Sequence, residues 1–500
     1  MSHLRSLMFV GTCSDAGKSI VNAAFCRILK QDGYQPAPFK AQNMSLNSFS
    51  TRDGGEMGRA QVVQAEACGI EPHTDMNPVL LKPTGDCTSQ VILEGHPVGN
   101  YSAKAYFDGK LQKDHLFTAA CQAYDRLKSR FNPIVMEGAG SVSEINLRDR
   151  DIVNMRMARY ANAATFLVAD IDRGGVFASV YGSILLLTEE ERKLMKGIII
   201  NKFRGDIELF NEGKHILEKL TGVPVVGIIP YFHDIQIEEE DSVVLERKHR
   251  SLEKGKINIA IVLLRHMSNF TDFDALEADP RFHSFYTNDA NEIRQADIIV
   301  LPGSKNTLDD LLHLRESGLA IAITEAYKTG KKVIGICGGY QMMGVRVEDP
   351  TNAEGQIAAL PGLGLLPQTT IIEATKVTRQ SHFSFLNGVN SSQNPFNCQG
   401  YEIHMGRTNL IDNVSPRPVA RIDDGRLDGY YLDAHCWGCY LHGIFDNASV
   451  RDHLAEGLTT RTSIPTFDYT AFKEEQYNHL ARHVRQHVNM DYIYRILKEE

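Results

Sequence analysis

The most constraining feature of this sequence is an alternation of short apolar runs with helical patterns, interrupted once. The alternation runs from residue 4 to about 230 and begins again at Ile257–Val262. Between these stretches, residues 236–256 hold two blocks of charged residues and few apolar anchors. Alternating strands and helices form βαβ units around a parallel sheet, and a charged break of this kind is typical of an interdomain linker. The sequence therefore predicts an α/β protein with a parallel-sheet domain followed by a second α/β domain.

The expected elements divide the chain into four parts. The predicted strands are Leu7–Val10, Ile134–Met136, Thr165–Ala169, Gly197–Ile200 and Val225–Ile229 in the first domain, and Ile257–Val262, Ile298–Leu301, Val333–Ile336 and a strand ending at His442 in the second. Helices are expected over Gly17–Gln31 and Ala103–Ser129. We expect a first domain over 1–235, a linker over 236–256, a second domain over 257–450 and a helical tail over 451–500.

Composition and charge exclude several classes of protein. The net charge of −9 and an isoelectric point near 6.1 argue against bulk binding of nucleic acid. The nine cysteines show no pairing framework, which suits a reducing cytoplasm. The chain starts directly with a strand, without a signal-peptide layout, and no apolar run approaches the length that spans a membrane. We therefore expect a cytoplasmic protein that binds neither nucleic acid nor membranes, and the sequence leaves its oligomeric state open.

A cysteine between glycines stands at a predicted strand-to-helix turn. Gly335-Ile336-Cys337-Gly338-Gly339 follows an apolar run and precedes a helical stretch, which is the pattern of a nucleophile elbow. At a helix N-terminus the dipole favours the thiolate. About a hundred residues later, His442 ends another apolar strand. Cys337 and His442 therefore suit an activated-thiol enzyme, whereas the alternative is a buried cysteine in a glycine-rich turn.

A second motif predicts phosphate binding near the N-terminus. Gly11-Thr12-Cys13-Ser14-Asp15-Ala16-Gly17-Lys18-Ser19 follows the first strand and opens a helix. Backbone N–H groups of such a loop cradle phosphates, the lysine reaches the terminal phosphates, and the serine hydroxyl binds Mg²⁺. Five residues, rather than the usual four, separate Gly11 from Gly17. Glu137 ends a strand expected beside this loop, where a carboxylate would hold the metal.

Long stretches of the chain resemble the corrinoid amidotransferase family, and most closely the cobyric acid synthases. The longer phosphate loop resembles that of dethiobiotin synthetase and its relatives, which activate carboxylates as acyl phosphates. The matching stretches are 40–48, 56–61, 77–83, 144–147, 151–155, 169–177 and 201–206, followed by 301–307 and 400–406 in the second domain. The resemblance implies a dethiobiotin-synthetase-like P-loop domain followed by a class I glutamine amidotransferase-like domain.

The resemblance also implies an activity and its ligands. Members of the family use glutamine and ATP to amidate the b, d, e and g carboxylates of adenosylcobyrinic acid a,c-diamide, giving adenosylcobyric acid. ATP and Mg²⁺ would be the cofactors, and the corrinoid and glutamine the substrates. Cys337 would attack glutamine and His442 would carry the proton, with an oxyanion hole made by backbone N–H groups at Gly303 and Gly338.

The remaining site residues are expected from the two motifs and the matching stretches. We expect ATP to contact Gly11, Thr12, Gly17, Lys18, Ser19 and Asn201, and Mg²⁺ to bind Ser19 and Glu137, with Glu56 as a further ligand. The expected corrinoid contacts are Lys40, Asn43, Lys82, Asp170 and Arg173, with Arg156 and Arg204 as further basic candidates. An ordinary turn at Asn201 and a helix-start carboxylate at Glu56 are the alternatives for those two residues.

Three other functions remain open at this stage, as does one feature of the thiol site. The alternatives are a cobyrinic acid a,c-diamide synthase, an amidoligase for a non-corrinoid substrate such as a cell-wall lipid precursor, and a P-loop regulatory ATPase with an inactive amidase domain. The acid that class I amidotransferases carry two residues after the histidine is replaced here by Ile444, and Asp446 lies nearby. The resemblance implies a Cys–His dyad, so the group that orients His442 is undetermined. Cys436 and Cys439 suggest two strand residues rather than a zinc site, which would need a fourth ligand.

Overall fold

The computed structural model describes residues 3–85, 88–102, 113–237, 252–386, 397–458 and 467–499. The chain forms two compact units. The first comprises Met1–Ser45, Glu56–Ile237 and Phe472–Glu500, and the second comprises Leu46–Gly55 and Glu238–Ala471. Both charge blocks of the expected linker fall within 238–251, and the start of the helix expected over Ala103–Ser129 falls within 103–112; these residues lie outside the described ranges.

The first unit contains a six-stranded sheet whose strands all run parallel. The strand order is β12 (Val225–Pro230), β11 (Met195–Phe203), β10 (Ala164–Asp170), β1 (Leu7–Gly11), β9 (Ile134–Glu137) and β2 (Ala37–Phe39). Every residue of β1, β9 and β10 is buried, as expected for a parallel sheet that is covered on both faces. The five strands predicted for this domain are confirmed, and β2 is an additional strand that the sequence analysis did not predict.

Helices and a smaller sheet complete the first unit. The helices are α1 (Lys18–Gln31), α2 (Arg59–Cys68), α4 (Lys113–Lys128), α5 (Met155–Ala161), α6 (Val176–Leu185), α7 (Glu189–Leu194) and α8 (Asn211–Thr221), with 3-10 turns η1 (Thr74–Met76), η2 (Ile145–Arg150) and η3 (Ile207–Phe210). The second sheet has the order β3 (Gln42–Met44), β6 (Val79–Gly85), β7 (Thr88–Leu93), β8 (His96–Ser102), and β5 (Glu56–Gly58) precedes α2. Because the carboxyl ends of parallel strands meet at the same edge of a sheet, one edge of the main sheet carries Gly11, Glu137, Asp170 and Asn201.

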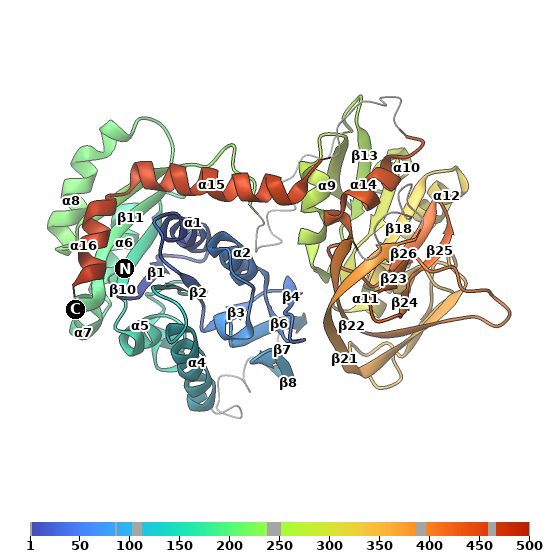
Figure 1. Cartoon of the computed structure of the whole chain (residues 1–500), viewed down its shortest axis with the longest axis horizontal. Helices are drawn as coiled ribbons and strands as arrows, with labels where there is room; N and C mark the ends of the chain where they lie inside the picture. The colour runs from blue at the N-terminus through green and yellow to red at the C-terminus, as the bar shows by residue number, and fades with distance from the viewer. Residues whose placement is uncertain are drawn as a thin grey trace. The chain divides into compact units, whose positions relative to one another are not determined.

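The end of the chain packs on the first unit. α15 (Tyr469–His487) leads to α16 (Met490–Lys498), and Figure 1 shows α16 beside the strands of the first sheet. Leu480, Val484 and Ile493 belong to the same apolar core as Phe9 and Phe25. The Arg485 guanidinium donates to the Asp32 carboxylate at the end of α1. The tail is therefore part of the core of the first unit from Phe472 onward.

The second unit is built around a six-stranded sheet with one antiparallel edge. The order is β15 (Phe282–Thr287), β13 (Ile257–Val262), β16 (Ile298–Leu301), β18 (Lys332–Ile336), β26 (Cys436–Cys439) and β25 (Tyr430–Asp433), and only β25 runs antiparallel to its neighbour. The predicted strands Ile257–Val262, Ile298–Leu301 and Val333–Ile336 are confirmed. β26 ends three residues before His442, because the chain turns away at Tyr440.

A second sheet and several short helices surround this core. The sheet has the order β20 (Ala359–Pro361), β19 (Arg346–Glu348), β21 (Gln368–Phe385), β23 (Ala420–Ile422), β24 (Leu427–Asp428), with β22 (Cys398–Leu410) also paired to β21. The helices are α9 (Asp274–Ala278), α10 (Ala290–Gln295), α11 (Thr307–Glu316), α12 (Leu319–Lys328), α13 (Gly338–Met342) and α14 (Ala448–Ala455), with turns η5 (Phe270–Phe273) and η6 (Ile444–Asp446). β14 (Met267–Ser268) pairs with β17 (Gly303–Ser304), and the segment that contains β4 (Ser48–Ser50) also belongs to this unit.

Candidate active sites

Cys337 lies on a strained turn between β18 and α13. Its backbone has φ 50° and ψ −108°, a conformation that residues other than glycine rarely adopt and that is typical of a nucleophile elbow. The neighbouring glycines are required by the available space. A Cβ on Gly338 would lie 2.7 Å from the backbone nitrogen of Ser304, and a Cβ on Gly339 would lie 2.0 Å from the carbonyl oxygen of Leu301.

His442 is the partner of this thiol, and its ring is held on two sides. Its ring stacks on Tyr401, with centroids 5.3 Å apart, and its Nδ1 lies 2.7 Å from Oδ2 of Asp272. Cys337 is also a hydrogen-bond partner of this ring. Burial alone would lower the pKa of His442, but the Asp272 carboxylate and the Cys337 sulfur raise it to about 10. The structure therefore brings together the two residues that the sequence predicts and adds a carboxylate that it did not.

Asp272 is the functional candidate that sequence reasoning missed. It lies 170 residues before His442, on η5, so no local spacing connects the two. The position that carries the acid in class I amidotransferases is occupied by the buried Ile444. A sequence signal exists only in the pattern Asn269-Phe270-Thr271-Asp272-Phe273, where an acid stands between two buried aromatic residues.

The expected oxyanion residues lie beside the elbow. A Cβ on Gly303 would come within 3.2 Å of Cε1 of His442, and Gly338 lies against the backbone of Ser304. The strand pair β14·β17 presents this loop. Gly303 and Gly338 are thus both next to the Cys337–His442 pair, where backbone N–H groups can meet an oxyanion.

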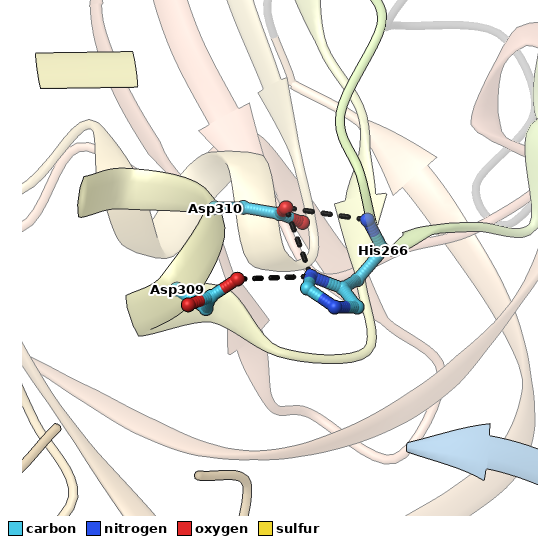
Figure 2. A group of neighbouring side chains, drawn as sticks. All are labelled: His266, Asp309 and Asp310. Carbon is cyan, nitrogen blue, oxygen red and sulfur yellow. Dashed lines mark hydrogen bonds and ion pairs between the residues drawn. The ribbon is translucent and has the colours of Figure 1, made fainter. Parts of the chain in front are cut away.

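Three titratable side chains, His266, Asp309 and Asp310, lie close together (Figure 2) and are linked to the same loop through Ser304. Asp310 Oδ1 accepts hydrogen bonds from the backbone N–H and Nδ1 of His266, while its Oδ2 accepts from the Ser304 hydroxyl at 2.6 Å. Asp309 approaches the same ring nitrogen at 3.5 Å. The hydrogen bond that His266 donates to the Asp310 carboxylate raises the pKa of His266. Because these contacts tie Ser304 and His266 to α11, the group supports the Gly303 loop.

Cys436 and Cys439 do not form a metal cluster in the described part of the chain. The His266 group is the one set of three His, Cys, Asp or Glu side chains there whose ligand atoms lie close together. Both cysteines are buried in β26, and burial raises the pKa of each thiol. They are strand residues, as the sequence analysis favoured.

The phosphate-loop motif connects β1 to α1. Gly17 precedes α1 with φ 89°, and a Cβ there would lie 2.2 Å from Nδ2 of Asn201. Lys18 is 4% exposed, and its Nζ donates to the carbonyl oxygens of Cys13, Ser14 and Gly140. The Thr12 N–H donates to Val168 on β10. Asn201 donates to the carbonyl of Ala16 at 2.9 Å, while its buried Oδ1 has no hydrogen-bond partner among the residues that the structure describes. Asn201 therefore supports the loop directly.

Ser19 and Glu137 meet at the base of this loop. The Ser19 hydroxyl donates to Oε1 of Glu137 at 2.7 Å, Lys40 approaches the same oxygen at 3.0 Å, and Gln64 donates to Oε2. Burial would raise the pKa of Glu137, but the Lys40 ammonium and the neighbouring donors hold it below its ordinary value. Mg²⁺ takes oxygen ligands and few protein side chains, so a hydroxyl and an ionised carboxylate beside a phosphate loop fit this ion.

The other candidate residues form separate ion pairs. Glu56 binds Lys82, with Nζ and Oε1 2.7 Å apart and both side chains buried. The Asn43 side chain donates to Gln61 at 3.1 Å. Asn43 lies on β3 and Lys82 on β6, which pair in the small sheet of the first unit. Glu56 is thus a partner of Lys82, which is not the arrangement expected of a ligand beside Ser19.

The predicted residues at the ends of β10 and β11 also pair with each other. Asp170 binds Lys202 at 2.9 Å and Arg173 at 3.7 Å, and Arg173, whose side chain is 57% exposed, also pairs with Asp15 of the phosphate loop. Arg204 binds Asp172, and Arg156 binds Asp114. Exposed cations at the phosphate loop can bind anionic groups. Arg173 reaches this loop, and the Lys202 ammonium also does so, since it donates to the carbonyl oxygen of Asp15.

Comparisons with known proteins agree with the two-domain organisation. Residues 7–244 match the model of the CobQ/CobB/MinD/ParA nucleotide binding domain, and residues 258–450 match that of the CobB/CobQ-like glutamine amidotransferase domain. The chain is 68% identical to a cobyric acid synthase of Parabacteroides distasonis, and the match covers 99% of both chains. It is 58% identical to one from Bacteroides fragilis, over 99% of both chains, and 47% identical to one from Syntrophobacter fumaroxidans, over 99% of this chain and 98% of that protein.

The fold and the two sites define an ATP-dependent glutamine amidotransferase, with a P-loop nucleotide-binding domain and a thiol amidotransferase domain. At full-length identities of this size, the chain belongs to the cobyric acid synthase family. The α/β architecture, the ATP-binding domain and the amidotransferase class predicted from the sequence are confirmed. Within the described ranges, no helix combines the length and apolar character needed to cross a membrane.

Proposed function

We propose that this enzyme amidates the b, d, e and g carboxylates of adenosylcobyrinic acid a,c-diamide and releases adenosylcobyric acid. ATP, Mg²⁺, glutamine and the corrinoid are the ligands of this reaction. The placement of an elbow cysteine beside a carboxylate-held histidine, in a chain that also carries a phosphate loop, supports the proposal most directly. The eight described cysteines are free thiols, which agrees with a cytoplasmic location.

Glutamine hydrolysis would take place at Cys337. The thiolate attacks the side-chain carbonyl of glutamine, and the tetrahedral oxyanion meets N–H groups of the Gly303 loop and Gly338. Nδ1 of His442 faces Asp272, so Nε2 is the nitrogen left to give a proton to the departing nitrogen, which leaves as ammonia. Water then hydrolyses the thioester to glutamate and restores the thiol.

Carboxylate activation would take place at the phosphate loop. A corrin carboxylate oxygen attacks the γ-phosphorus of ATP, ADP leaves, and ammonia then attacks the acyl carbon and expels phosphate. Lys18 and the backbone of Gly11–Ser19 would position the phosphates. Ser19 and Glu137 would hold Mg²⁺, which neutralises phosphate charge when bound, and Arg173 beside the loop could contact an anionic group. Lys40, Asn43, Lys82 and Asp170 remain proposed corrinoid-site residues; Glu56, paired with Lys82, is a weaker metal candidate than Glu137.

Mass spectrometry of the corrinoid product tests this proposal. The a,c-diamide incubated with enzyme, glutamine and ATP should gain four amides, each lowering the mass by about one unit because OH is replaced by NH₂. A cobyrinic acid a,c-diamide synthase would instead add amides only to unamidated cobyrinic acid. No amide gained on either substrate, together with active glutamine hydrolysis, would indicate a non-corrinoid acceptor.

A further inference from the structure

Each oxygen of the Asp272 carboxylate contacts a group of the turn that carries His442. Its Oδ2 lies 2.7 Å from Nδ1 of His442, and its Oδ1 accepts the Gly443 N–H at 2.9 Å. Both side chains of the Asp272–His442 pair are 1% exposed. Gly443 has φ 67°, which lets the backbone N–H turn toward the same carboxylate. The acid therefore fixes both the ring and the backbone of the histidine.

This arrangement determines which ring nitrogen serves the thiol. A hydrogen bond from Nδ1 to a carboxylate selects one tautomer and one orientation of an imidazole and stabilises its protonated form. Nε2 is then left for Cys337, the other hydrogen-bond partner of this ring. Asp446, the acid nearest in sequence, lies on η6 and does not take this place, because Asp272 occupies Nδ1.

We propose that Asp272 is the positioning acid of the glutaminase, so that the site is a Cys–His–Asp triad whose acid precedes the cysteine in the chain. The inference rests on the proposed role of Cys337 and His442 in glutamine hydrolysis. In this triad the acid comes from a turn 170 residues before the histidine, whereas class I amidotransferases carry it two residues after the histidine. Asp272 does not need to touch glutamine, and it acts through His442.

The variant Asp272→Asn keeps the size of the side chain and removes its charge. We expect the kcat for glutamine hydrolysis to fall by at least about a hundredfold, because an amide no longer stabilises the imidazolium. The KM for glutamine should change little, and ammonia-dependent amidation should persist. The pH profile of Cys337 alkylation by a glutamine-like reagent should shift to higher pH than in the parent. Asp272→Glu, which keeps the charge, should recover part of the loss.

Asp446→Asn is the matched control, and it should leave glutamine hydrolysis within twofold of the parent. Parental kcat and pH profile in Asp272→Asn would overturn the assignment, as would loss only in Asp446→Asn. If the Asn variant does not fold, Asp272→Glu decides: a partial loss of glutamine hydrolysis with a changed pH profile of Cys337 alkylation supports the assignment, and parental values of both overturn it. Failure of corrinoid amidation in the parent would refute the proposed substrate and would leave the glutaminase result interpretable.

A second observation concerns the support of the same turn by residues from the N-terminal half of the chain. Leu46–Gly55 belongs to the second unit. Oδ1 of the fully buried Asn47 accepts the N–H of Phe270, the first residue of η5, at 3.0 Å. The Ser48 N–H donates to Asn269, which has φ 53°. The turn that carries Asp272 is therefore held by side-chain and backbone groups of this segment.

The same segment also contacts Tyr401, whose ring stacks on His442. The Phe49 ring lies 4.8 Å from that of Tyr401, which stacks on His442, and Gln380 donates to the carbonyl of Ser50 at 2.7 Å. We infer that Asn47, Ser48 and Phe49 of this segment are positioning residues of the glutaminase, although they lie inside the sequence range of the nucleotide-binding domain. This inference also rests on the glutaminase role of Cys337 and His442.

A double-mutant cycle distinguishes positioning from general support. Asn47→Ala in the full-length enzyme should lower the kcat for glutamine hydrolysis severalfold, whereas Arg52→Ala, an exposed change in the same segment, should not. In the Asp272→Asn background, Asn47→Ala should add little, because its effect passes through that acid. Full additivity, a parental rate, or an equal loss of ammonia-dependent amidation would overturn the inference. Phe49→Leu provides a second variant if Asn47→Ala does not fold.

Discussion

Gly303→Ala tests the loop beside His442 by adding a single carbon atom. The added Cβ would lie 3.2 Å from Cε1 of His442 and 3.2 Å from both the carbonyl and hydroxyl oxygens of Ser268. Carbon contacts are favourable from about 3.5 Å, so the ring or the loop must move by about 0.3 Å. Displacements of about 1 Å in an active site can cost a hundredfold in rate, and we expect about a tenfold loss here, or ~1.4 kcal/mol.

The assay compares glutamine hydrolysis with ammonia-dependent amidation in the same preparation. Only the first should fall, and it should fall in kcat rather than in KM. Gly182→Ala is the control, because Gly182 lies within α6 and nothing comes within 4 Å of its added Cβ. Parental glutamine hydrolysis in Gly303→Ala would show that this loop tolerates displacement and would remove the support for its role at the oxyanion.

Cys337→Ala should abolish glutamine use and spare ammonia-dependent amidation, and glutamine turnover at the parental rate would disprove the nucleophile. Lys18→Ala should lose both amidation activities, by several kcal/mol of transition-state stabilisation or roughly a thousandfold, while basal glutaminase partly survives; normal ATP turnover would contradict the phosphate loop. Glu137→Gln should weaken Mg²⁺-dependent turnover and leave Cys337 alkylation intact, and Glu56→Gln should match it only if Glu56 is a ligand. In the folded protein the pKa of His442 is raised from 6.5 to about 10, so the folded state binds this proton more tightly than the unfolded state does. The free energy of unfolding should therefore fall as pH rises from 6.5 to 10. Denaturant titrations across that range should lack this decrease in His442→Gln.

The sequence predicts the fold well because its signals are local. Each apolar run that alternates with a helical pattern lies in a strand of the parallel sheet of the first unit or of the mostly parallel sheet of the second. The strand β2 was not predicted, because Ala37-Pro38-Phe39 is too short and contains a proline. The elbow and the phosphate loop are equally local signals. Each turn has room only for glycine, beside Cys337 in one case and at Gly17 in the other, so the glycine spacing in the sequence identifies the turn.

The contacts of the site residues could not be predicted in the same way, because burial pairs charges from distant segments. Lys40 and Lys82 are expected to meet corrin carboxylates, and the structure shows in addition that each approaches a buried protein carboxylate, Glu137 and Glu56 respectively. A cation inside a protein requires an opposite charge, and the sequence does not show which one it meets. A substrate carboxylate at either lysine would have to share or replace that partner.

The acid beside His442 illustrates why a missing motif residue does not mean a missing function. A triad requires a carboxylate near Nδ1, and no particular position along the chain is needed to supply it. In this chain the position two residues after the histidine is occupied by the buried Ile444. The acid beside the ring is Asp272 on η5, which lies 170 residues earlier in the sequence. The backbone of η5 is in turn held by Asn47 and Ser48, which are still more distant in sequence. A comparison limited to the residues after the histidine would describe a dyad, whereas the contacts describe a histidine oriented from three separate segments.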